Sequence, residues 1–229
     1  MNIQGWQKLT LLDYPGHLAA TLFCGGCQIN CPFCHNSELL RGPFKPGIAW
    51  DDVLAFLKKR QGVLEGVCVT GGEPLLQADI ADAIRDIKEL GFAVKLDTNG
   101  GFPDKLSELI EGELVDYVAM DIKNRPEKYP ETCGVDFLDV TPFACSKDLL
   151  LEGKVDYEFR STIVSPVHTV EDVLAMGEWI RGARRYYLQK FVMRDMVRDK
   201  TLKPWKDDLM KQVCKQFQGV CEVVEVRGV

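Results

Sequence analysis

Three cysteines, Cys27, Cys31 and Cys34, occur in one short stretch at the spacing C-x3-C-x2-C. A four-iron, four-sulfur cluster normally takes one thiolate for each iron, so three cysteines would hold three irons and leave the fourth open. An open iron can bind a small molecule through an amine and a carboxylate, which are the groups at the methionine end of S-adenosylmethionine. The spacing therefore predicts a cluster that acts on a bound ligand rather than one that only stores electrons.

A structural zinc site is the main alternative for the same cysteines. Cys24 precedes Cys27, so four cysteines fall within eleven residues. Closely spaced cysteine pairs also form tetrahedral zinc sites. On the cysteines alone a zinc-binding interaction protein stays open, and anaerobic iron and sulfide analysis would separate it from an iron–sulfur enzyme.

The surrounding residues carry a family resemblance. Residues 31–36 read CPFCHN, with an aromatic residue before the third cysteine of the motif. This pattern resembles the radical S-adenosylmethionine (radical SAM) superfamily, and within it the activating enzymes of glycyl-radical enzymes. Residues 5–6, 12–16 and 25–27 read GW, LDYPG and GGC, and they are most similar to the longer form of the anaerobic ribonucleoside-triphosphate reductase activating proteins.

The resemblance implies an activity, cofactors and partners. Its cofactors would be one 4Fe–4S cluster and S-adenosylmethionine, and the enzyme would be an oxidoreductase. The reduced cluster would cleave the cofactor to methionine and a 5′-deoxyadenosyl radical, which would take a hydrogen atom from a glycine Cα of a partner. The implied partner is an anaerobic ribonucleotide reductase with a glycine-bearing C-terminal loop, and the implied reductant is a flavodoxin or ferredoxin. The alternatives are an activase of the pyruvate formate-lyase type and a radical enzyme for a small molecule.

Composition narrows the class of protein. The 229 residues carry a formal net charge of −6, which argues against nucleic acid as the main partner because no basic excess is available to neutralise phosphates. No apolar run reaches the roughly 18 residues that a membrane span needs, and the N-terminus does not read as a signal peptide. Nine cysteines do not suggest a secreted disulfide pattern at this length. We therefore expect a cytoplasmic protein with no membrane partner.

The order of expected elements is strand then helix, repeated, which favours a parallel sheet with helices outside it. Six such units are too few for a closed eight-stranded barrel, and the resemblance implies a partial (β/α)6 barrel. We expect one domain, 1–229, with an N-terminal arm at 1–16, a barrel core at 18–192 and a C-terminal extension at 193–229. Strands are expected at 18–23, 67–70, 92–96, 115–120, 157–164, 186–192 and 220–226, and helices at 50–60, 78–90, 103–111, 142–151, 170–181 and 205–217.

Polar motifs follow four of these strands directly. They are the cysteine loop, Gly71-Gly72-Glu73, Asp97-Thr98-Asn99, and the pair Asp121 and Lys123. Because the carboxyl ends of parallel strands meet at one rim, these motifs should lie together, as active-site residues do in α/β barrels. A structural zinc site would not need the other three motifs, so their positions favour the iron–sulfur interpretation.

The resemblance implies a role for each of these residues. Gly71, Gly72 and Glu73 would approach the amino group of the cofactor, and Lys123 would contact its carboxylate. Asn99 would also lie beside the cofactor, although Thr98 and Asn99 suit ordinary turns as well. A monovalent cation next to the carboxylate would be bound by Asp97, Thr98, the Ala119 carbonyl and Asp121.

Further residues are implied at the adenine and at the barrel mouth. Phe33 and the backbone around His35 match adenine-binding positions, whereas Asp13, His35 and Arg160 match positions near the partner's glycine loop. An ion pair inside the barrel is the alternative for Arg160. Related enzymes have a histidine on the last barrel strand that touches the ribose, and this sequence has none there, so Gln189 is expected to replace it.

The remaining cysteines and histidines are expected to be structural. Cys68 lies within an expected strand, and His17 and His168 lie in expected turns. No second block of clustered cysteines separates Cys34 from Gly71, which is typical of the compact activases with one cluster. No ligand spacing assigns a role to the other cysteines, Cys24, Cys133, Cys145, Cys214 and Cys221.

Overall fold

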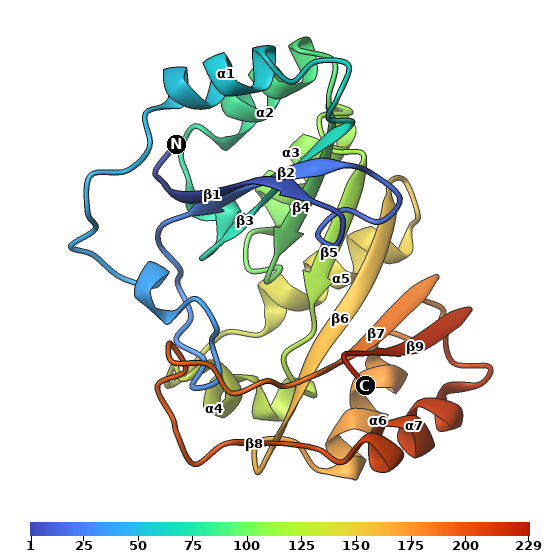
Figure 1. The fold of residues 1–229 in the computed structure, drawn as a ribbon. Coiled ribbons are helices and arrows are strands. Elements are labelled where there is room, and N and C mark those ends of the chain that lie inside the picture. Colours follow the sequence, from blue (N-terminus) through green and yellow to red (C-terminus); the bar gives the residue numbers. More distant parts are fainter.

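The computed structural model describes all 229 residues and has one nine-stranded sheet (Figure 1). Six strands lie side by side in chain order, and each is parallel to the next. This arrangement confirms the partial barrel predicted from the sequence. The six strands are β2 (Ala19–Cys24), β3 (Gly66–Gly71), β4 (Ala93–Thr98), β5 (Tyr117–Asp121), β6 (Asp156–Ser165) and β7 (Arg185–Lys190).

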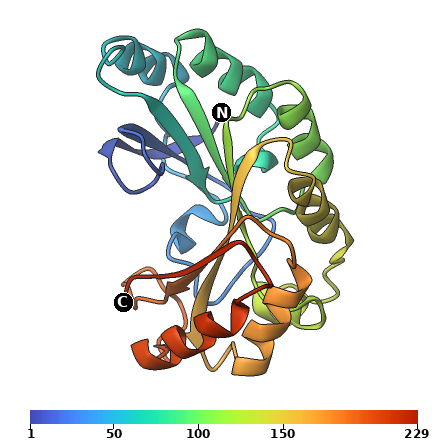
Figure 2. The same ribbon diagram turned by 90° about the vertical axis from the view of Figure 1, so that its right-hand side faces the viewer.

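The helices cover the outer, convex side of this sheet (Figure 2). Strand residues alternate between the two faces, so Val67 and Val69 join the main apolar core while Cys68 and Thr70 face the other way. Each helix turns its apolar side to the sheet, as Ile80, Ile84 and Ile87 do. The helices are α1 (Trp50–Lys58), α2 (Ile80–Glu89), α3 (Pro103–Glu111), α4 (Tyr129–Cys133), α5 (Thr141–Leu151), α6 (Val170–Trp179) and α7 (Asp207–Cys214).

Both edges of the parallel sheet are extended. β1 (Ile3–Thr10) pairs antiparallel with β2, and β9 (Val223–Arg227) pairs parallel with β7. β9 is therefore a seventh parallel strand, and it adds to the six units that the sequence indicated. Arg227 on β9 binds Glu158 on β6 through two hydrogen bonds of 2.9 Å, so an ion pair across the inner face fixes this edge.

The expected elements lie within three residues of the observed ones, and two elements were not expected. α4 lies in the proline-containing connection after β5, and the two-residue strand β8 (Lys203–Pro204) pairs with the end of β6. The last expected helix is shorter and continues as a 3-10 turn, Lys215–Phe217. The structure contains no helix with the length and apolar character needed to cross a membrane.

Candidate functional site: a cysteine-lined cavity at the carboxyl ends of the strands

One cavity collects the motifs that follow the strands. It lies where β2 to β6 end, and the cysteine loop after β2 forms one of its walls. The predicted rim of the barrel is therefore formed by residues far apart in the sequence. The predicted site residues that line it are Cys27, Cys31, Phe33, Cys34, His35, Gly71, Gly72, Asp97, Thr98, Asn99, Asp121, Lys123 and Arg160.

Hydrogen bonds to its backbone from three separate segments hold the cysteine loop. Cys27 N–H donates to the Leu40 carbonyl at 3.0 Å, and Asn30 N–H donates to the Cys133 carbonyl at 2.7 Å. The Arg198 guanidinium donates to the Asn30 and Cys31 carbonyls at 2.9 and 3.3 Å. These contacts fix the loop and leave the three thiols facing the cavity.

Asn99 connects the cysteine loop to the end of β4. Its Nδ2 group donates to the Cys27 sulfur at 3.7 Å, and its Oδ1 accepts from Gln28 Nε2 at 2.8 Å. Hydrogen bonds to a ligating sulfur are one of the means by which proteins tune an iron–sulfur cluster. Asn99 therefore contacts Cys27, one of the three predicted cluster ligands, whereas the resemblance implied a position beside the cofactor.

Cys24 does not join the other three cysteines. It is buried in the main apolar core between sheet and helices, whereas Cys27, Cys31 and Cys34 pack in a second, smaller core. No group of three or more His, Cys, Asp or Glu side chains is arranged to hold a single metal ion. Because Cys24 lies in a different core and does not line the cavity, the four cysteines do not converge, and three thiols at the cavity fit a cluster with one open iron.

Gly71 and Gly72 are required by the backbone of the protein itself. A Cβ on Gly71 would lie 2.2 Å from the Cys24 nitrogen, and a Cβ on Gly72 would lie 2.0 Å from the Gly26 carbonyl oxygen. This close approach lets Gly72 N–H donate to the Cys24 carbonyl and Glu73 N–H donate to the Gly26 carbonyl. The two glycines thus line the cavity and also join β3 to the cysteine loop.

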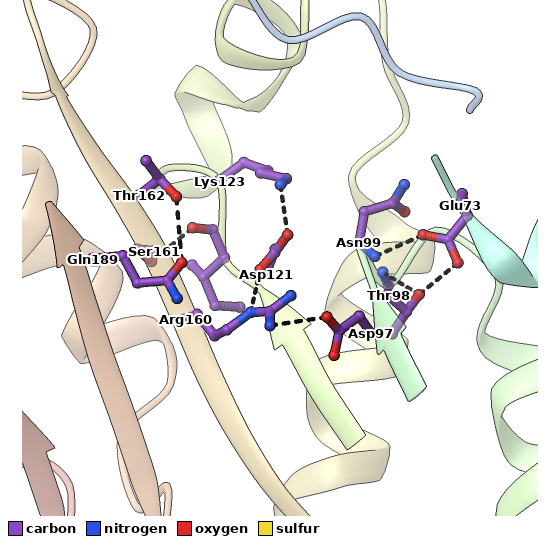
Figure 3. Close-up of polar contacts among 12 residues, drawn as sticks. Glu73, Asp97, Thr98, Asn99, Asp121, Lys123, Arg160, Ser161, Thr162 and Gln189 are labelled. Atoms are coloured by element: carbon purple, nitrogen blue, oxygen red, sulfur yellow. Dashed lines mark hydrogen bonds and ion pairs between the residues drawn. The ribbon is translucent and has the colours of Figure 1, made fainter. Parts of the chain in front are cut away.

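Glu73 lies beneath the cavity and does not line it. Its fully buried carboxylate accepts hydrogen bonds from Thr98 Oγ1–H at 2.8 Å and Asn99 N–H at 2.7 Å (Figure 3). It also accepts from Leu75 N–H at 3.0 Å. Burial raises the pKa of Glu73 to about 7, against the opposing effect of these three donors. Glu73 thus positions the Asn99 turn through hydrogen bonds to Thr98 and Asn99, and its expected contact with the cofactor stays a prediction.

Replacing Glu73 with glutamine is expected to destabilise the apoprotein by about 1–3 kcal/mol, because the new amide would leave a buried N–H donor without an acceptor. Because the pKa of Glu73 is raised on folding, the folded protein holds this proton more tightly than the unfolded chain. The resulting stability is fully present below about pH 4.5 and is lost as the pH rises to about 7. Urea unfolding across this range should show a weaker dependence on pH in Glu73→Gln. Glu65→Gln is the matched control, because Glu65 is exposed and accepts one backbone N–H; equal losses in both variants would contradict the argument.

Charged side chains from three neighbouring strands meet inside the barrel. Arg160 on β6 donates to Asp121 at 2.8 Å and to Asp97 at 3.1 Å. Lys123 donates to the other Asp121 oxygen at 2.9 Å (Figure 3). Lys95 pairs with Asp97. We call these five residues the barrel ion network.

The two carboxylates of the barrel ion network stay ionised although they are largely enclosed, with the Asp97 and Asp121 side chains 13% and 28% exposed. Burial alone would raise the pKa of Asp121, but Arg160 and Lys123 lower it well below its usual range. The pKa of Asp97 is lowered in the same way, by Arg160 and Lys95 against burial. Burial likewise opposes the charge of Lys123, yet Asp121 keeps its pKa raised. The cavity wall is therefore a fixed array of charges, with Lys123 available to a ligand carboxylate.

Aromatic side chains form the opposite wall. His35 Nε2–H donates to the Val192 carbonyl at 2.8 Å, and its ring stacks on Phe191. Phe33 is 5% exposed and meets the edge of His168, whose Nε2–H donates to the Lys123 carbonyl at 2.8 Å. The predicted structural role of His168 agrees with these contacts, because it supports both Phe33 and Lys123.

Besides Glu73, three predicted site residues do not line this cavity, and the first, Ala119, is buried in β5 beside Asp97 on β4. Asp13 accepts a hydrogen bond from Thr21 at 2.6 Å and lies on the loop between β1 and β2. Because this loop precedes β2 in the chain, it meets the amino end of β2, whereas the cysteine loop follows its carboxyl end. Gln189 accepts from Thr162 at 3.4 Å, and Thr162 rather than Gln189 lines the cavity.

Four residues at the site were missed in the sequence. Gln28 and Arg198 hold the cysteine loop, Lys95 pairs with Asp97, and Cys133 packs buried beside Cys31. Lys95 could have been found in the sequence, because side chains alternate along a strand and Lys95 therefore lies on the same face of β4 as Asp97. Arg198 and Cys133 contact the cysteine loop from segments distant in the sequence. Gln28 lies in the loop itself, where no periodic pattern indicates the direction of a side chain.

Comparison with known proteins agrees with this geometry. The sequence model of the Radical SAM superfamily matches residues 21–142. A candidate glycyl-radical enzyme activating enzyme of Methanocaldococcus jannaschii is 31% identical over 99% of this chain and 96% of its own length. The pyruvate formate-lyase-activating enzyme of Listeria monocytogenes is 32% identical over 56% of this chain and 56% of its own.

Solved structures agree in fold. The structure of Streptococcus suis SuiB bound to S-adenosylmethionine matches with a TM-score of 0.68 at 14% identity, covering 89% of this chain and 48% of SuiB. Family membership implies a 4Fe–4S cluster and S-adenosylmethionine, and the cysteine-lined cavity fits both. The chain belongs to the radical SAM superfamily, and within it to the family of the glycyl-radical enzyme activating enzymes.

Proposed function

We propose that this enzyme activates an anaerobic ribonucleoside-triphosphate reductase by generating a radical on a glycine of that partner. The observation that carries the activase proposal is one cavity that joins three cysteines to the charged ends of β4 and β5. The choice of partner rests on the similarity of residues 5–6, 12–16 and 25–27 to activating proteins of such reductases.

The residues of this chain would bind and orient the cofactors. When bound, the cluster and S-adenosylmethionine supply the chemistry, in which one electron cleaves the sulfonium and a hydrogen atom leaves the partner's glycine. Cys27, Cys31 and Cys34 would hold three irons, and the Lys123 ammonium would pair with the carboxylate of the methionine end. Phe33 and His35 offer aromatic surface for the adenine and keep water from that side of the cavity.

A monovalent cation beside this carboxylate remains a prediction. Asp97 and Asp121 supply anionic oxygens, but Arg160 lies between them and already binds both. The Thr98 hydroxyl donates to Glu73, on the opposite side of β4 from Asp97. Binding of a cation would require Arg160 or Thr98 to change partners.

The test is a mixture of reduced enzyme, S-adenosylmethionine and a purified anaerobic ribonucleotide reductase, examined by electron paramagnetic resonance. We expect the doublet of a glycyl radical, and we expect none when the reductase carries alanine at its radical glycine. A doublet with pyruvate formate-lyase but none with the reductase would replace the named partner and keep the activase function. Absence of both the doublet and cofactor cleavage would overturn the activase proposal.

Pyruvate formate-lyase is the second candidate partner because its activating enzyme in Listeria monocytogenes matches 56% of this chain. The two partners give different outcomes in the same experiment, so no separate assay is needed to choose between them.

A further inference from the structure

A basic surface segment crosses the outside of the cysteine loop. We call residues 192–206, between β7 and α7, the basic segment. Five basic and two acidic side chains give it a net charge of +3, in a chain whose net charge is −6. All five basic side chains are exposed, and none of them forms an ion pair. They are Arg194, Arg198, Lys200, Lys203 and Lys206.

Hydrogen bonds attach the basic segment to the loop that carries the cysteines. Arg198 donates to the Asn30 and Cys31 carbonyls, and His35 donates to the Val192 carbonyl. Ser37 Oγ–H donates to the Met196 carbonyl at 2.5 Å. In Figure 1 the segment is the orange-red chain that runs beside the blue loop after β2. A protein bound to this segment would therefore lie next to the cluster ligands.

Exposed apolar side chains accompany the charges. Val192, Met193 and Met196 are 51%, 38% and 44% exposed, close to the bonds that attach the segment. Methionine side chains are flexible and polarisable, so they suit surfaces that bind partners briefly. Apolar groups surrounded by unpaired charges are typical of a docking surface whose charges speed association and orient the partner.

The location of the segment indicates what kind of partner it binds. The inner side of the cysteine loop faces the cofactor cavity, so an electron carrier has to approach from the outer side. The rest of this chain is strongly acidic and would repel an acidic carrier, whereas the basic segment would attract it. The charge pattern thus favours one orientation, with the carrier against the cysteine loop.

We propose that the basic segment is the docking surface for an acidic one-electron carrier protein of the flavodoxin or ferredoxin class. This inference rests on the proposed function, because it assigns a surface to the reductant of that reaction. The carrier is oxidised by one electron and the cluster is reduced by one electron, with no atom or proton transferred. The glycyl-radical partner needs no contact with this surface.

The test compares Arg194→Glu/Lys203→Glu with the control Lys58→Glu/Lys59→Glu, which makes the same charge change at the end of α1. Lys58 and Lys59 are exposed and form no ion pair. With a purified acidic flavodoxin or ferredoxin at low salt, we expect the first variant to reduce its cluster about ten-fold or more slowly, measured by bleaching of cluster absorbance. The control should match the wild type, and high salt should remove the difference.

Dithionite separates docking from the rest of the reaction, because this small reductant needs no docking surface. With dithionite, we expect the Arg194→Glu/Lys203→Glu variant to reduce its cluster, cleave S-adenosylmethionine and form the glycyl radical as the wild type does.

The outcomes separate the proposals. If the carrier reduces the clusters of the Arg194→Glu/Lys203→Glu variant and the Lys58→Glu/Lys59→Glu control at equal rates, the docking proposal is overturned. A loss of glycyl radical with dithionite would assign the surface to the glycyl-radical partner instead. If the wild type cleaves no cofactor even with dithionite, the proposed function fails, while the bleaching measurement still tests the docking.

Discussion

Replacing Cys31 with alanine is expected to abolish assembly of the 4Fe–4S cluster and all cleavage of S-adenosylmethionine. Cys31 is one of only three thiols at the cavity, and loss of one thiolate leaves two irons without a protein ligand. Cys27→Ala and Cys34→Ala should behave alike. Iron and sulfide content after anaerobic reconstitution, together with the paramagnetic resonance of the reduced protein, measures the effect.

Cys24→Ala is the matched control for this prediction. Cys24 precedes the same loop but lies in the main core, so its replacement should reduce stability and leave the iron content unchanged. Replacement of a buried cysteine by alanine removes only one sulfur, and the protein should still fold. Full iron loading in Cys31→Ala would show that Cys24 or Cys133 replaces it, and loss of iron in Cys24→Ala would revive the four-cysteine site.

The rim of this site could be predicted from the sequence because its formation follows two general rules of α/β folds. Apolar runs separated by helical patterns give parallel strands in chain order, and the carboxyl ends of such strands meet. Polar motifs placed immediately after those runs, such as Asp97-Thr98-Asn99 and Asp121, therefore converge whatever the details of packing. This is why the cysteines and the ends of β3, β4 and β5 line one cavity.

The positions that could not be predicted depend on contacts distant in sequence. Nothing local indicates that residues 3–10 pair antiparallel with β2. The position of Asp13 was predictable, however, because a residue that directly precedes β2 lies at the amino end of that strand. Arg198 reaches the Asn30 carbonyl from a segment without periodic pattern. The Glu73 carboxylate accepts from Leu75 N–H in its own turn, but its other two donors, Thr98 and Asn99, come together with it only when β3 and β4 are folded.

Replacing Arg160 with leucine is expected to destabilise the protein by about 1.5–3 kcal/mol at neutral pH, because Asp97 and Asp121 lose the cation that they share and keep one lysine each. Arg185→Leu is the matched control. Arg185 lies on the neighbouring strand and pairs with Asp156, but this ion pair is about one-third to one-half exposed, so its loss should cost about 0–1 kcal/mol. Guanidinium chloride unfolding of both variants measures the difference.

The dependence on pH gives this prediction a second, independent check. In the wild type the pKa values of Asp97 and Asp121 are lowered, so their ion pairs contribute stability above the usual carboxyl pKa of about 3.9 that is lost as the pH falls through the lowered values. Without Arg160, burial is opposed only by Lys95 and Lys123, so both pKa values should rise and the carboxyls should take up protons at higher pH. The cost of Arg160→Leu should therefore shrink as the pH falls toward 4, and adding Asp97→Asn should recover part of it. A cost equal to that of Arg185→Leu at pH 7 would mean that the two lysines suffice, and that Arg160 is free to bind the partner's loop.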